Sequence, residues 1–250
     1  MRAKDLDARC RACYVSLARE TRRRGLDAQA ARESAAALSR RIDGTWYLRE
    51  RAFKPTGIAL GCPLPAGTVA DRLWRIVNVA ARRIALLDPE RRPAFSFVPR
   101  EWYHTTIVNR SHYTIDSSMA EGGSMVRMFD EERRQVREIV AECGLREIVV
   151  HLNGMLLTRG GRLIVPGFPA DDRLYDLRRK LVRELPQLGV NTPVTCHVKV
   201  GHLIAPFGPS ESEAVLRIIA HCGDHVSARL AFHDVFTPAG RVAFSGGADA

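Results

Sequence analysis

The sequence has no long hydrophobic run. No apolar stretch approaches the ~18 residues that a membrane-spanning helix needs, and the first ten residues, MRAKDLDARC, have no apolar core of the kind found in secretory signals. These two absences predict a cytoplasmic protein that does not insert into a membrane.

Cysteine is sparse, with six residues scattered over the 250-residue chain. Cys10 and Cys13 form a Cys-x-x-Cys pair, but the surrounding residues are typical of a helix, and no second ligand pair follows. We therefore favour free thiols in a reducing compartment over a zinc or redox site. The sequence shows no cluster of Asp, Glu and His, so we expect neither a metal nor a cofactor.

Acidic residues are fewer than basic ones, 28 Asp plus Glu against 38 Lys plus Arg, and the formal net charge is +10. A positive surface field favours anionic ligands, including phosphate and nucleic acid. The alternative is that the many arginines lie on solvated helix faces without a ligand. The 46% of hydrophobic and 26% of charged residues are typical of a folded chain.

Hydrophobic periodicity divides the chain into an N-terminal extension, residues 1–50, and a larger domain, residues 51–250. Residues 5–42 are rich in Ala, Arg and Leu with no strand signal, and Gly25 divides them into two expected helices. The larger domain alternates strands with amphipathic helices, which predicts an α+β fold. We expect single strands at 57–62, 101–110 and 194–206, and hairpins at 147–168 and 226–245. We expect helices at 68–88, 130–144, 171–186 and 210–223.

Two of these strands carry a histidine in the middle, and each follows a strand and a helix, so we expect two related lobes. Side chains alternate along a strand. His104 and Thr106 therefore share one face of the first strand, and His197 and Lys199 share one face of the second. Each pair either binds a phosphate or simply faces water.

The segments HTTI, residues 104–107, and HVKV, residues 197–200, resemble the paired His-x-Thr/Ser motifs of the two-histidine (2H) phosphoesterase superfamily. The order of elements agrees from about residue 57 to about residue 235. The resemblance implies a bilobal, pseudo-symmetric fold in which two antiparallel sheets line a central groove. It also implies a phosphodiesterase that opens 2′,3′-cyclic phosphates of nucleotides or RNA ends, with His104 and His197 catalytic and with Thr106 and Lys199 on the phosphate.

Two histidines suit this reaction without a metal. One neutral imidazole takes a proton from the attacking water, and an opposed imidazolium protonates the departing ribose oxygen. Histidine populates both forms near neutral pH. A hydroxyl or a cation two residues along each strand can hold the non-bridging phosphate oxygens.

The second motif departs from the family pattern, because Lys199 stands where Thr or Ser is usual. Lys199 is either an altered phosphate ligand, the mark of a site that has lost activity, or a solvated strand charge. Gly201 and His202 stand where an arginine is frequent in several relatives. The alternative function is therefore a weak or inactive module that binds a nucleotide or RNA, and a third is a structural protein whose histidines belong to the core.

Two tyrosines flank the first motif. Tyr103 and Tyr113 are candidates for stacking on a base, and the alternative for both is core packing or surface exposure. The extension, residues 1–50, either covers the groove or forms a contact between two copies of the chain.

Overall fold

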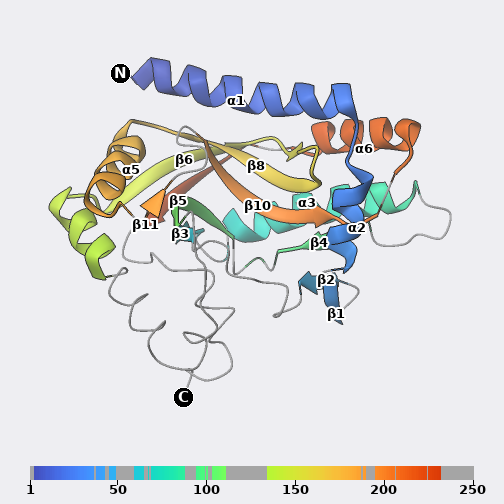
Figure 1. Cartoon of the computed structure of the whole chain (residues 1–250), viewed down its shortest axis with the longest axis horizontal. Coiled ribbons are helices and arrows are strands. Elements are labelled where there is room, and N and C mark those ends of the chain that lie inside the picture. The colour runs from blue at the N-terminus through green and yellow to red at the C-terminus, as the bar shows by residue number, and fades with distance from the viewer. Residues whose placement is uncertain are drawn as a thin grey trace.

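A computed structural model describes most of the chain (Figure 1). The described residues are 3–36, 38–42, 45–48, 59–64, 67, 69–87, 94–98, 100, 103–110, 134–186, 188–189, 195–205, 207–223 and 225–231. The predicted α+β class is confirmed, because helices pack on an open antiparallel sheet. No helix in these ranges is long and apolar enough to cross a membrane.

The helices are α1 (Ala3–Arg24), α2 (Ala28–Ala36), α3 (Val69–Ala85), α5 (Arg173–Glu184) and α6 (Pro209–His221), and residues 134–142 are also helical. The strands of the main sheet are β3 (Ala59–Pro63), β4 (Phe95–Phe97), β5 (His104–Arg110), β6 (Glu147–Asn153), β7 (Leu156–Leu157), β8 (Arg162–Pro169), β9 (Leu188–Gly189), β10 (Cys196–Leu203) and β11 (His225–Ala231).

The main sheet runs in the order β11-β6-β8-β10-β5-β3, with the short strands β4, β7 and β9 paired to its members. Every recorded pairing in it is antiparallel. Strands from the second half of the sequence join those from the first half between β10 and β5, where Val198 pairs with Thr105. The described strands from β3 to β11 thus form one continuous sheet where two were expected, since this pairing links the two halves.

The main core lies on one face of this sheet. Leu163 and Val165 of β8 and Val198 of β10 point into it, together with the apolar sides of α3, α5 and α6. Ile164, between Leu163 and Val165, points to the opposite face and packs against α1. Side-chain alternation along β8 therefore separates the main core from the layer formed by α1, which runs along the sheet in Figure 1.

α1 is attached to the sheet where β8 and β10 meet. The Tyr14 hydroxyl donates to the carbonyl of Cys196 at 2.5 Å and accepts the Cys196 N–H at 3.0 Å. Cys10 and Tyr14 are buried against Ile164. Burial also raises the pKa of the Cys10 thiol, which keeps it protonated and unreactive. The N-terminal helix is therefore a layer of the molecule.

The break between the two N-terminal helices is confirmed. Gly25 has φ of 72°, which a residue with a Cβ rarely adopts, and its N–H donates to the Thr21 carbonyl at 2.9 Å. The prediction that the extension contains no strands is wrong. β1 (Leu38–Ile42) and β2 (Thr45–Leu48) form a two-stranded antiparallel hairpin. The local signal was overlooked: Asp43-Gly44, a common pair in hairpin turns, stands between Ile42 and the β-prone Thr45, Trp46 and Tyr47.

Only the first strand of the hairpin predicted at 226–245 lies within the described residues. β11 pairs with β6 along its whole length, from His225 with Asn153 to Ala231 with Glu147. The second expected run, residues 240–245, lies outside the described residues. The described partner of β11 is therefore a strand that is distant in sequence.

Candidate functional site

The pairing of β5 with β10 places the two motifs side by side. Val198 and Thr105 are partners, and both are buried on the core face. Their neighbours in each strand point to the opposite face. Because the strands run antiparallel, Thr106 lies beside His197, and His104 lies beside Lys199.

The four side chains share one sheet surface, and all four are half-buried. β10 and β5 are neighbours in the strand order, with β8 beyond β10 and β3 beyond β5. Ile164 of β8 is the strand partner of Lys199 and packs against α1. α1 therefore borders this surface. The structure therefore brings His104, Thr106, His197 and Lys199 together beside α1.

A buried arginine of α5 ties the two strands to each other. The Arg178 guanidinium donates to the carbonyls of Ile107 at 2.7 Å, Thr106 at 2.7 Å and Thr195 at 2.9 Å. Two of these acceptors belong to β5, and the third immediately precedes β10. Arg178 thus fixes the position of the two histidine-bearing strands relative to each other.

The surroundings of His197 favour its neutral form. Burial lowers the pKa of His197 to about 4. The charges that add to this shift come from basic side chains on four elements: Arg178, Arg162, His104 and Lys199. His197 is therefore a neutral imidazole at neutral pH, free to accept a proton when an anion is bound nearby.

Lys199 is a cation in a poorly solvated place. Burial, followed by the charge of Arg162, lowers the pKa of Lys199 to about 8. Within the described part of the chain, no carboxylate contacts its ammonium group. A buried cation without a counter-ion is unfavourable by itself and becomes favourable when an anion binds.

The chain matches no protein-family model, and no curated protein matches its sequence significantly. The arrangement of these side chains is therefore the basis for any functional conclusion.

The predicted base-stacking role of Tyr103 is wrong. Its side chain is 1% exposed and packs in the main core, so it presents no ring face to a ligand. The alternative, core packing, is what the structure has, because Tyr103 precedes β5 on its buried side. Tyr113 lies outside the described residues.

Sequence reasoning missed Arg178 and Arg162. The missed signal for Arg178 was its position, since it shares the apolar side of α5 with the buried Leu174, Leu177 and Leu181. A charged residue in such an apolar stripe is expected to have a hydrogen-bond partner or a functional role. Arg162 opens a strand and carries no comparable local signal, and its position beside His202 follows only from the pairing of β8 with β10.

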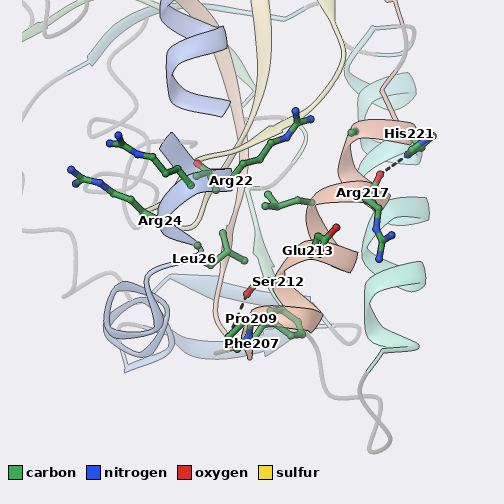
Figure 2. A pocket seen from close by; sticks show the side chains of 14 residues that line it. Arg22, Arg24, Leu26, Phe207, Pro209, Ser212, Glu213, Arg217 and His221 are labelled. Atoms are coloured by element: carbon green, nitrogen blue, oxygen red, sulfur yellow. Dashed lines mark hydrogen bonds between the residues drawn. The ribbon is translucent and has the colours of Figure 1, made fainter. Parts of the chain in front are cut away.

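Two other hollows offer weaker chemistry. A groove of about 770 Å³ lies between the last turn of α1 and α6 (Figure 2). Two polar groups drawn there are engaged locally: Ser212 donates to the Phe207 carbonyl at 3.4 Å, and His221 Nδ1 lies 2.7 Å from the Arg217 carbonyl.

The second hollow, about 470 Å³, is lined partly by His151 and His225. Their rings stack with centroids 5.7 Å apart, and His151 Nδ1 lies 2.9 Å from Ser227 Oγ. His225 and Ser227 are exposed. Three aspartates also line this hollow, and two of them are paired, Asp171 with Arg173 and Asp7 with Arg11. No described group of three or more His, Cys, Asp or Glu side chains is placed to hold a metal ion.

Proposed function

We propose that the protein opens 2′,3′-cyclic phosphates of nucleotides or RNA ends by proton transfer between two histidines. The observation that carries this proposal is the antiparallel pairing of Val198 with Thr105. It gives His104, Thr106, His197 and Lys199 one half-buried surface of the kind that the resemblance to 2H phosphoesterases implies. The finer bilobal, pseudo-symmetric 2H fold is part of the same proposal.

The two histidines take different roles in this reaction. His197 is neutral at neutral pH because burial lowers its pKa, so it accepts the proton of the water that attacks phosphorus. As the new P–O bond forms, the bond to one ribose oxygen breaks, and His104 in its protonated form gives that oxygen a proton. Thr106 and Lys199 hold the non-bridging oxygens, on which negative charge builds up.

A second candidate is a nucleotide-binding or RNA-binding module without turnover. It is favoured by the low pKa of His197, about 4, because a base works best when its pKa lies near the operating pH. Lys199 adds to this alternative, because a cation that binds the product tightly slows its release.

A thermal-shift screen with 2′-AMP, 3′-AMP and 2′,3′-cyclic AMP, followed by a hydrolysis assay with and without EDTA, tests the proposal. We expect stabilisation by all three ligands and hydrolysis of the cyclic one that survives EDTA. Stabilisation without hydrolysis would identify the binding module, and no stabilisation would leave a structural protein. Activity that depends on added Zn²⁺ or Mn²⁺ would contradict the two-histidine mechanism.

A further inference from the structure

A β-bulge in β10 gives the candidate site a second group of basic side chains. Lys199 pairs with Ile164 and His202 with Arg162, and the register shifts between Lys199 and Gly201. Ile164 and Arg162 are two positions apart on β8, so they point to the same face. Lys199 and His202, three positions apart, would face opposite ways in a regular strand. The bulge brings them to one face.

Arg162, His202 and Lys199 are close enough to influence one another electrostatically. After burial, the charges of Lys199 and Arg162 are the causes that lower the pKa of His202 to about 3. Arg162 also lowers the pKa of Lys199. The Nδ1 atom of His202 is buried and has no hydrogen-bond partner among the residues that the structure describes. Basic groups gathered without a described counter-ion favour an anionic ligand.

The distance between this group and the histidine pair limits what the ligand can be. The step from Lys199 to His202 corresponds to two positions on β8, or about 7 Å along the strand. The step from His197 to Lys199 covers a similar length. A spacing of about 7 Å between two phosphate-binding groups matches the distance between two phosphates separated by a ribose. It is too long for the two phosphorus atoms of a pyrophosphate.

We propose that Arg162 and His202 bind the 5′-phosphate of the ribonucleotide whose 2′,3′-cyclic phosphate lies between His104 and His197, with Lys199 on the cyclic phosphate. This inference rests on the proposed function and names its substrate class, a ribonucleotide phosphorylated at both ends. The 5′-phosphate is either free or part of the phosphodiester that continues into an RNA chain. Arg162 supplies a fixed charge, and neutral His202 donates one ring N–H to a phosphate oxygen.

Calorimetry with two product-like ligands tests the second phosphate directly. We expect adenosine 2′,5′-bisphosphate to bind at least about tenfold more tightly than 2′-AMP, because it adds charge-assisted hydrogen bonds. Affinities that agree within about twofold would overturn the proposal.

A pair of variants separates a specific site from the general positive field. Arg162→Gln should lower the affinity for the bisphosphate about tenfold more than the affinity for 2′-AMP. The control is Arg146→Gln, which removes the same charge from an exposed turn and should leave the preference for the bisphosphate intact. If Arg162→Gln weakens both ligands equally, no second phosphate is held there and the proposal fails.

Hydrolysis assays distinguish failure of this inference from failure of the proposed function. The substrates are 2′,3′-cyclic AMP, its 5′-phosphorylated form, and a dinucleotide that ends in a 2′,3′-cyclic phosphate. We expect the last two to show a higher kcat/KM than the first. Hydrolysis of all three at equal kcat/KM would overturn the second subsite alone. Hydrolysis of none, with the bisphosphate preference retained, would overturn the proposed function and keep the two-phosphate site.

Discussion

At the scale of single residues, the proposed reaction depends on where two imidazoles and two phosphate ligands point. Each motif places its histidine and the residue two positions later on the same side of a strand, and the described surface holds all four at intermediate exposure. Partial burial strengthens the electrostatic interactions of these side chains.

The first residue-scale prediction concerns the histidines. His104→Ala and His197→Ala should each reduce kcat for 2′,3′-cyclic AMP by at least about a hundredfold, because each removes one proton-transfer group. Circular dichroism and the melting temperature should remain close to those of the parent protein. A loss of only a few fold in both variants would remove these side chains from the mechanism.

Lys199 can be tested as a phosphate ligand by substitution. Lys199→Ala should weaken binding of 2′-AMP by about 1.5–3 kcal/mol, the range of a hydrogen bond to a charged group, and should flatten the salt dependence of binding. Lys199→Thr should recover a site like that of the family and raise turnover if the lysine retains product. Lys180→Ala is the control, because the Lys180 ammonium pairs with Glu142 at 2.9 Å on another surface. Unchanged calorimetric affinity in Lys199→Ala would mean that this lysine does not reach the phosphate.

At the scale of elements, the site depends on how β4, β5, β8 and β10 are held together. One helix reaches the site through Arg178, and a short strand reaches it through the close approach of β4 to Gly201. Both contacts form between segments that are distant in sequence, and each can be tested by one substitution with a matched control.

Arg178→Met should leave three backbone carbonyls without this donor. Each buried unsatisfied acceptor costs about 1–3 kcal/mol, so we expect a clear loss of stability in urea unfolding. We also expect a loss of kcat on the order of a hundredfold, because the histidine strands are no longer held at one spacing. Arg179→Met, which changes an exposed arginine on the same helix, should alter neither quantity. Parent-like kcat in folded Arg178→Met would show that the strands keep their spacing without it.

A substitution of Gly201 tests how much the site depends on the bulge in β10. A Cβ at this position would lie 2.7 Å from the Ser96 carbonyl oxygen of β4, so Gly201→Ala should cost about 1–3 kcal/mol of stability through overpacking. It should also reduce the preference for adenosine 2′,5′-bisphosphate over 2′-AMP, because His202 follows the bulge. Gly160→Ala is the matched control, since a Cβ there meets no atom within 4 Å. If Gly201→Ala melts like the parent, β4 moves aside at little cost.

At the scale of the whole molecule, burial of basic groups links stability to pH and to anions. The pKa of His197 is lowered to about 4 and that of His202 to about 3. Between these values and about 6.5, the unfolded chain binds protons that the folded protein excludes. Stability from these groups is complete above about pH 6.5 and is lost as the pH falls toward 4.

Thermal unfolding followed from pH 4 to pH 7 should therefore show a melting temperature that rises with pH. Bound sulfate should raise the pKa of both imidazoles, so its stabilising effect should be larger at pH 5 than at pH 7. Sulfate keeps the same charge over this range, which makes it a suitable probe. The double variant His197→Asn, His202→Asn should lose most of both effects, because neither position titrates. An equal sulfate effect at both pH values in the parent protein would contradict the coupling.

The sequence alone determined the α+β class, most helix positions, and the face that each motif residue takes on its own strand. These features depend on local periodicity and on residues within a few positions of one another. Charged residues on an apolar helix stripe, such as Arg178, were also visible locally, although their acceptors were not.

Only the tertiary structure decided that β5 and β10 are neighbours, that Arg178 joins them, and that a bulge turns His202 toward Lys199. It also decided that Tyr103 is buried. Strand pairing across a long stretch of chain is chosen by the packing of the entire core and by the register of every adjacent strand. No local pattern around His104 or His197 contains that information, because the energy that selects the pairing comes from residues far away in the sequence.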